Sequence, residues 1–243
     1  EFLKKYKKKN YNHNFNFVAV SKWLMNEAQK SNVLKNFNIT HIPNNINKDD
    51  FEIIEKNIAK KYLNINSEKQ IICYGSQNPQ SKRKGWEIFV ESLKTLDKSR
   101  YFLLIFGNFW SHDTLKKIGI EFKSLGYIEN KKDLSNVYSC ADFFVAPSIQ
   151  DAWPKTFAEA MLCKTPVICF NNTRISEIIE HKIDGFIVDK HNANELKRGI
   201  DWMSEEVKSS DALGNKARIK IENYDAKLIS LKYISLYKKL LQN

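Results

Sequence analysis

The feature that most constrains the fold is an alternation of short apolar runs and helical segments between residues 70 and 188. Short strands are expected near residues 71, 102, 122, 143, 166 and 186, and all of them except the one near 122 are apolar runs. Strands that are apolar on both faces are typical of parallel sheets covered by helices on each side. The alternation predicts an α/β fold with a Rossmann-like, doubly wound parallel sheet, followed by C-terminal helices.

A loop at residues 148–153 separates a predicted buried strand from a predicted helix. Pro154 suits the first turn of that helix, where its missing N–H is not needed. The helix would begin with unpaired N–H groups on about Lys155, Thr156 and Phe157. A helix N-terminus just beyond the carboxyl end of a parallel strand is an anion site suited to a pyrophosphate.

Two carboxylates frame this turn. Asp151 lies in the loop and Glu159 lies on the helix, with seven residues between them. Carboxylates accept hydrogen bonds from paired hydroxyls, so the loop acid could hold a sugar and the helix acid a ribose. The alternative is structural: Asp151 caps the helix and Glu159 is solvated. The spacing alone leaves both interpretations open.

The formal net charge of +11 fits three kinds of partner: nucleic acid, an anionic membrane surface or a phosphorylated substrate. Most of the charge is lysine, spread widely beside abundant Asn and Ile, so a bias of the source genome is an equally good explanation. The clusters at residues 4–5, 7–9 and 82–84 stand out from this background. No recognised nucleic-acid motif or interleaved aromatic platform is present, and we expect no nucleic-acid partner.

The four cysteines, Cys73, Cys140, Cys163 and Cys169, stand singly in or beside apolar runs. Their spacing does not match a metal site, so we interpret them as reduced core residues and expect a cytoplasmic protein. No apolar stretch approaches the roughly 18 residues that a membrane-spanning helix needs. We expect a polar helix at residues 49–63, a strand at 15–20 and a helix capped by Ser21. Three helices are expected at 193–207, 213–221 and 226–241.

The ordered set of short motifs resembles the retaining nucleotide-sugar glycosyltransferases of the GT-B architecture, the large family often numbered four. The matching residues are Ser148, Asp151, Glu159-Ala160-Met161, Thr165-Pro166-Val167-Ile168, Glu177 and Gly185-Phe186-Ile187-Val188. The resemblance implies one half of a GT-B protein, which binds a nucleoside-diphosphate sugar. It also implies transfer of the sugar with retention to a glycan or lipid-linked acceptor.

The resemblance also assigns roles around the donor diphosphate. Lys84 matches a lysine that neutralises it. Ser76 stands where an arginine is usual, so Arg83 or Lys82 is expected to substitute from the far end of the loop, and the bidentate grip of an arginine on phosphate makes Arg83 plausible. A solvated basic loop is the alternative for residues 82–84. The amides of Lys155 and Thr156 complete the diphosphate site, and no cofactor or obligatory metal is expected.

Further donor contacts follow from the same resemblance. Asp151 would orient the sugar, Glu159 would bind the ribose, and Trp153 closes the loop beside them. The backbone of Tyr127 and Ile128 would contact the base, although Tyr127 taken alone is more typical of a core aromatic. Asn172-Thr173-Arg174 replaces an expected Gly-Gly pair, so Arg174 would supply a side-chain contact where close backbone approach is lost.

The resemblance divides the chain into three parts. Residues 1–47 match the end of a truncated N-terminal domain and its linker, residues 48–224 the donor-binding domain, and residues 225–243 a helix that crosses back. The acceptor site would lie in the missing N-terminal domain, so we expect this chain alone to be inactive. We also expect peripheral contact with the inner face of the membrane. The alternative function is a non-catalytic nucleotide-binding or scaffold module of the same fold.

Overall fold

The structure is a computed structural model that describes residues 2–11, 14–109, 112–151, 153–171, 174–209 and 211–242. These residues form two compact units. The larger unit contains residues 46–223, and the smaller one combines residues 1–45 with residues 224–243. Each unit is described by itself.

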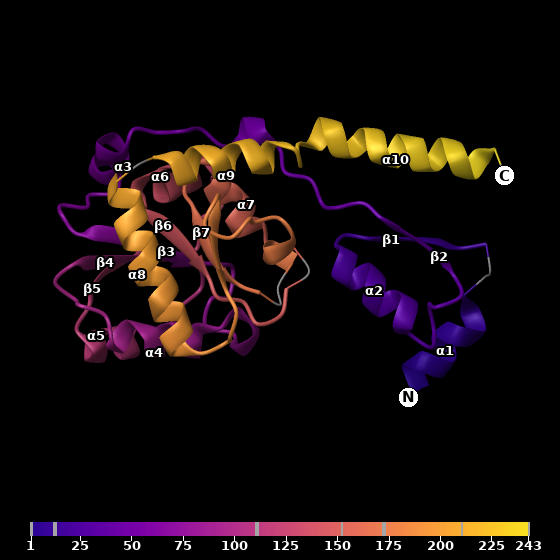
Figure 1. Cartoon of the computed structure of the whole chain (residues 1–243), viewed down its shortest axis with the longest axis horizontal. Helices are drawn as coiled ribbons and strands as arrows, with labels where there is room; N and C mark the ends of the chain where they lie inside the picture. Colours follow the sequence, from indigo (N-terminus) through magenta and orange to yellow (C-terminus); the bar gives the residue numbers. More distant parts are fainter. Residues whose placement is uncertain are drawn as a thin grey trace. The chain divides into compact units, whose positions relative to one another are not determined.

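The larger unit is built on a six-stranded parallel sheet (Figure 1). Its strand order is β5-β4-β3-β6-β7-β8, and every neighbouring pair is parallel. The strands are β3 (Gln70–Gly75), β4 (Tyr101–Phe106), β5 (Glu121–Ser124), β6 (Phe143–Ala146), β7 (Val167–Phe170) and β8 (Gly185–Val188). The chain moves outward from β3 in one direction and then restarts at β6 in the other. The predicted doubly wound sheet is confirmed, with its topological switch point between β3 and β6.

Helices pack on both faces of this sheet. They are α3 (Lys56–Tyr62), α4 (Trp86–Lys94), α5 (Asp113–Ile118), α6 (Lys131–Cys140), α7 (Lys155–Leu162), α8 (Ala193–Ser209) and α9 (Ala212–Glu222). Helix α4 contacts α5 and α8, whereas α6 contacts α3 and α7, and α7 contacts α9. Alternate strand residues therefore enter two separate cores. Ile72 and Phe143 join the core of α4, α5 and α8, and their neighbour Phe144 packs against Tyr138 of α6.

The prediction of a helix at residues 49–63 is wrong for residues 49–55. A 3₁₀ turn, η1 (Lys48–Asp50), is followed by extended chain, and α3 begins only at Lys56. Phe51 is 4% exposed, and the backbone N–H groups of Glu52 and Ile54 donate to hydroxyls of α6, each at 3.2 Å. These bonds to a helix that lies more than 80 residues further along the chain replace the local bonds of a helix, so tertiary contacts override local preference here.

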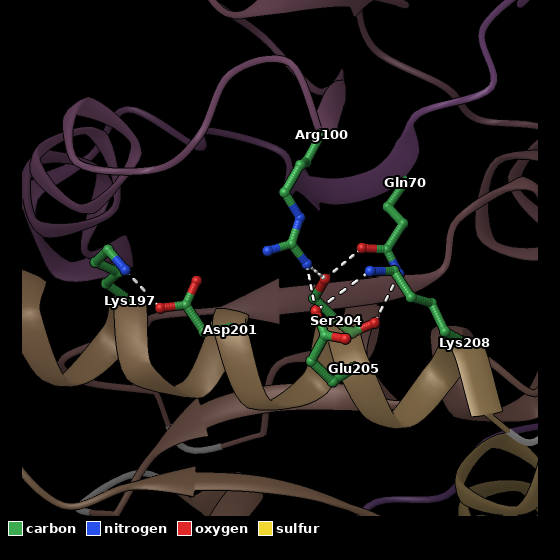
Figure 2. A network of polar contacts seen from close by, with 7 residues as sticks. All are labelled: Gln70, Arg100, Lys197, Asp201, Ser204, Glu205 and Lys208. Atoms are coloured by element: carbon green, nitrogen blue, oxygen red, sulfur yellow. Dashed lines mark hydrogen bonds and ion pairs between the residues drawn. The ribbon is translucent and has the colours of Figure 1, made fainter.

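A polar network closes the amino ends of β3 and β4 against α8 (Figure 2). Gln70 Nε2 donates to the Ser204 carbonyl oxygen at 2.7 Å, and Arg100 donates to Ser204 Oγ at 3.0 Å. Arg100 also pairs with Glu205, which Lys208 contacts at 3.2 Å. Figure 2 also shows the Lys197–Asp201 pair on the same helix. Gln70 and Arg100 at this end thus each have a partner on α8.

The four cysteines lie in the core of the larger unit as free thiols. The prediction that they are core residues is confirmed. Burial is the main cause that raises the pKa of the Cys163 thiol to about 12 and that of Cys73 well above its usual value. Such thiols stay protonated near neutral pH and behave as small apolar side chains.

The smaller unit contains α1 (Phe2–Asn10), β1 (Asn16–Ala19), α2 (Lys22–Lys30), β2 (Asn38–His41) and α10 (Ala226–Leu241). Strands β1 and β2 are parallel and place Phe17 opposite Ile39. Ser21 Oγ accepts the Leu24 N–H at 3.2 Å, which confirms the predicted helix cap. Across both units, none of the described helices combines the length and the apolar character that crossing a bilayer requires.

Candidate functional site

A cavity of about 390 Å³ lies at the carboxyl ends of β3, β4 and β6, beside the switch point of the sheet. Open α/β sheets bind ligands at this position, because the loops after the two central strands diverge there. Its lining includes predicted site residues from four loops and helices: Ser76, Arg83, Lys84, Tyr127, Ile128, Asp151, Trp153, Lys155, Thr156 and Glu159. The structure therefore brings together residues that lie up to 83 positions apart in the sequence.

Two loops that form one wall of the cavity are fixed to each other by backbone contacts. Gly85 has a φ angle of 72° and ends the short 3₁₀ helix η2 (Lys82–Lys84). A Cβ atom on Gly85 would lie 1.8 Å from the carbonyl oxygen of Pro147. The Ile149 N–H donates to the Arg83 carbonyl oxygen at 2.9 Å. Only glycine allows the loop of Lys84 to lie this close to the loop of Asp151.

Lys84 and Asp151 form an ion pair within this wall. Their side chains are 13% and 12% exposed, whereas Arg83, 3.5 Å from the same Asp151 oxygen, is largely exposed. Asp151 Oδ1 accepts the Trp153 N–H at 3.3 Å, but helix α7 has Pro154 at its N-cap and no side-chain cap bond. The alternative that Asp151 caps the helix is therefore wrong. The alternative that residues 82–84 form a solvated basic loop is also wrong for Lys84, because its side chain is largely shielded from solvent.

The N-terminus of α7 opens into the cavity. Pro154, with a φ of −73°, immediately precedes the first helical residue, so it stands one position before the predicted first turn. Lys155 and Thr156 line the cavity, and the N-cap residue Pro154 makes no side-chain hydrogen bond to the N–H groups of this turn in the described part of the chain. These amides and the helix dipole favour an anion at this point.

Glu159 lies about one helical turn further along α7 and is 6% exposed. Its Oε2 accepts the Tyr138 O–H at 2.8 Å, and its Oε1 lies 3.5 Å from Lys131 Nζ. The alternative that Glu159 is a solvated helix residue is wrong. A carboxylate that is buried at the wall of a polar cavity suits recognition of ligand hydroxyl groups.

Ser76 follows β3 and Tyr127 follows β5, and both approach the cavity although β4 separates these two strands. Ser76 is 8% exposed, and its hydroxyl has no hydrogen-bond partner among the described residues. Tyr127 is 56% exposed, so the alternative that it is a core aromatic is wrong. Ile128 also lines the cavity. The expected loop of residues 172–173 lies outside the described part of the chain, as does the side chain of Arg174.

Several residues that line the cavity were not predicted from the sequence: Gln77, Asn78, Phe106, Glu129, Lys131 and Leu134. Gln77 and Asn78 follow β3 directly, so their place after a central strand was a signal that could have identified them. Lys131 is the first residue of α6, and its ammonium lies 5.1 Å from the centre of the Phe51 ring. Its proximity to Glu159 depends on how α6 packs beside α7, which no local pattern reveals.

The fold and the site define a doubly wound α/β domain with a polar cavity at its switch point. Residues 55–220 match the family model described as "Glycosyl transferases group 1". The chain therefore belongs to the glycosyl transferases group 1 family. The matched range contains the whole sheet and every residue that lines the cavity.

Several known proteins resemble the chain over most of its length. An uncharacterized glycosyltransferase of Methanocaldococcus jannaschii is 25% identical over 233 residues, which cover 91% of this chain and 59% of that protein. The N,N'-diacetylbacillosaminyl-diphospho-undecaprenol alpha-1,3-N-acetylgalactosaminyltransferase of Campylobacter jejuni is 26% identical over 66% of this chain and 43% of its own length. The chain thus spans about half the length of these two relatives.

Solved structures support the fold. A glycosyltransferase from Rickettsia africae has a TM-score of 0.85 at 22% identity, covering 100% of this chain and 68% of its own. Anabaena HepE, solved in complex with UDP and glucose, has a TM-score of 0.76 at 18% identity, covering 92% and 63%. At these identities the likeness establishes the GT-B type of fold, and the chemistry has to be argued from the cavity.

Proposed function

We propose that this chain binds the nucleoside-diphosphate sugar of a glycosyltransferase, and that the whole protein transfers the sugar with retention. The observation that carries the proposal is the cavity at the switch point. There the partly buried Lys84–Asp151 pair, the start of α7 and the buried carboxylate of Glu159 line one cavity. Cationic and anionic groups in one cavity match a ligand that combines a diphosphate with hydroxyl groups.

The diphosphate would bind to Lys84, Arg83 and the amides of Lys155 and Thr156. In the free chain Asp151 balances both basic side chains, with Arg83 at 3.5 Å. Ser76 offers a buried hydroxyl in place of a second charge after β3, so Arg83 supplies that charge from the end of the loop. These groups would neutralise the departing diphosphate without an obligatory metal.

The sugar and the nucleoside would use the remaining groups. Asp151 lies beside the basic loop and would accept hydrogen bonds from the sugar hydroxyls, whereas Glu159 would accept them from the ribose hydroxyls. The exposed ring of Tyr127 and the backbone of Ile128 flank the space for the base, and Trp153 closes the cavity at the loop. We include Arg174 as a donor contact on the strength of its sequence position alone.

In the proposed reaction, the acceptor oxygen bonds to the anomeric carbon on the face that the diphosphate leaves. The bond from that carbon to the diphosphate oxygen breaks, and the diphosphate keeps both electrons while the acceptor's hydroxyl proton is released. Positive charge near the leaving oxygens lowers the barrier, because negative charge grows there in the transition state.

The acceptor is proposed to be a glycan or a lipid-linked glycan. Two relatives support this class by their names: the Campylobacter jejuni enzyme acts on a diphospho-undecaprenol sugar, and an Escherichia coli relative is an O-antigen chain mannosyltransferase. We propose accordingly that the whole protein works in the cytoplasm at the inner face of the membrane. The net charge of +11 favours contact with anionic lipids.

The test compares nucleoside diphosphates with monophosphates. UDP, GDP and ADP are titrated into the chain by calorimetry in the presence of EDTA, and the tightest ligand is compared with its monophosphate in Lys84→Ala. We expect Lys84→Ala to weaken diphosphate binding about 10-fold or more, because a charge-assisted bond to phosphate is lost, and to leave monophosphate binding within about 3-fold.

Lys82→Ala is the matched control. Lys82 lies on the same turn of η2 and is exposed, but it does not line the cavity. Its substitution should leave both affinities unchanged. Equal diphosphate affinity in Lys84→Ala and in the unchanged chain would contradict the diphosphate site.

A further inference from the structure

The two carboxylate oxygens of Glu159 lie in different surroundings. Oε2 faces the core and accepts a 2.8 Å hydrogen bond from the Tyr138 hydroxyl. Oε1 faces the ammonium of Lys131 at 3.5 Å, and Lys131 is half exposed at the cavity wall. A contact of this length leaves Oε1 able to accept stronger hydrogen bonds from a ligand.

Tyr138 is held rigidly behind this carboxylate. It is completely buried in α6, and its ring packs against Phe106 at 5.7 Å and Phe144 at 5.8 Å between ring centres. Its backbone carbonyl oxygen accepts the Thr165 hydroxyl at 2.7 Å. A side chain fixed on this many sides cannot rotate away from Glu159 without disturbing the core.

The direction of the hydrogen bond is also fixed. Burial, and then the neighbouring Glu159 carboxylate, raise the pKa of Tyr138 well above its usual value. The phenol therefore remains a donor at every pH at which the protein would work. Glu159 Oε2 accepts this hydrogen bond, and Oε1 is turned toward Lys131 at the cavity wall.

We propose that Tyr138 is a positioning residue that makes the site selective for ribose over deoxyribose. By holding Oε2, it keeps Oε1 at the distance and angle that the ribose hydroxyls need. Tyr138 does not itself contact the ligand, since it does not line the cavity. The inference rests on the proposed function, in which Glu159 binds the ribose, and adds the group that gives this contact its selectivity.

The experiment measures a ratio of affinities. The nucleotide that binds most tightly among UDP, GDP and ADP is titrated beside its 2′-deoxy and 3′-deoxy counterparts into the unchanged chain, Glu159→Ala and Tyr138→Phe. We expect the unchanged chain to prefer the ribonucleotide about 10-fold or more, because hydrogen bonds to a buried charge are lost without the hydroxyl. Tyr138→Phe should reduce this preference below about 3-fold and leave the deoxynucleotide affinity unchanged.

Two further variants separate positioning from general stability. Tyr101→Phe removes the hydroxyl of another buried tyrosine at the start of β4, at the opposite end of the strands, and should retain the full preference. Phe144→Leu keeps the Tyr138 hydroxyl but loosens its ring, so it should give an intermediate ratio and serves if Tyr138→Phe folds poorly.

The outcomes distinguish the two proposals. A preference that disappears in Glu159→Ala but is complete in both Tyr138→Phe and Phe144→Leu would overturn the positioning role and leave the proposed function intact. Equal loss of ribonucleotide and deoxynucleotide affinity in Tyr138→Phe would also overturn it, because a structural defect acts on both ligands. No preference in the unchanged chain would contradict the ribose contact itself.

Discussion

The two ends of the six-stranded sheet both carry charged and polar side chains, but they use them differently. At the amino ends, Gln70 and Arg100 are paired with Ser204 and Glu205 on α8. At the carboxyl ends, the Ser76 hydroxyl has no partner among the described residues, and the α7 N-terminus has no side-chain cap. At the amino ends these four side chains are paired with one another, whereas the carboxyl ends retain hydrogen-bonding capacity for a ligand.

The size of a hollow does not distinguish the two ends. A depression of about 430 Å³ beside the amino-end network is comparable with the cavity of about 390 Å³ at the carboxyl ends. Gln70, Arg100 and Lys208 line the depression, and all three are engaged with α8. The comparison teaches that unsatisfied polar groups at a switch point, rather than volume, identify the binding end.

The largest effect is expected at Gly85, where the two loops of the cavity wall lie in close contact. Gly85→Ala should destabilise the chain by about 3 kcal/mol or more and abolish nucleotide binding, because the left-handed conformation and the contact with Pro147 both exclude a Cβ atom. Chemical denaturation and calorimetry measure the two losses.

Gly119 provides the matched control for that substitution. It is also left-handed, with a φ of 74°, but a Cβ atom there would meet nothing within 4 Å. Gly119→Ala should cost only about 1–2 kcal/mol and leave binding intact. Equal costs at the two glycines would contradict the close approach of the two loops.

An intermediate effect is expected at the amino-end network. Ser204→Ala should lower the free energy of unfolding by about 1–3 kcal/mol, because Gln70 and Arg100 each lose a partner in a buried position. Nucleotide affinity should not change, since this end has no role in binding. Ser209→Ala, at an exposed position of the same helix, should be nearly neutral, and a change of affinity in Ser204→Ala would break the comparison.

The smallest effect concerns a third region, at the β8 edge of the sheet. Burial lowers the pKa values of His181 and His191, and His181 Nδ1 accepts the Ile187 N–H at 3.0 Å. The unfolded chain therefore binds more protons than the folded chain near the usual histidine pKa, so stability falls as the pH drops from 7 to 5. Urea unfolding should show a smaller loss of stability between pH 7 and pH 5 in the double variant His181→Gln/His191→Gln than in the unchanged chain. An equal loss in both proteins would assign the acid sensitivity elsewhere.

The strands of the sheet other than β5 were predictable because their apolar runs are short, separated and free of competing patterns, whereas β5 reads Glu-Phe-Lys-Ser and lies at the edge of the sheet. The segment at residues 49–55 was not, because its backbone partners are Ser135 and Ser139, more than 80 residues away on α6. A polar sequence that resembles a solvated helix is held extended by those hydroxyls. Local pattern cannot reveal a distant acceptor.

The same limit applies within the site. Asp151 and Glu159 were identifiable from their order along the chain, but their surroundings were not. Lys84 reaches Asp151 across 67 residues, and Tyr138 reaches Glu159 across 21. The burial of Glu159 and the partial burial of Asp151 follow from the packing of α6 and of the basic loop around α7, and this packing is visible only in the folded chain.

The most direct test of the account is to map the bound nucleotide on the two ends of the sheet. Amide chemical shifts of the chain are followed by NMR during titration with UDP, GDP and ADP. The account predicts saturable changes at Ser76, Lys84, Thr156 and Glu159 with one of the three, and none at Gln70, Arg100 and Ser204. Changes confined to the amino-end residues, or no saturable change with any of them at millimolar concentration, would contradict it.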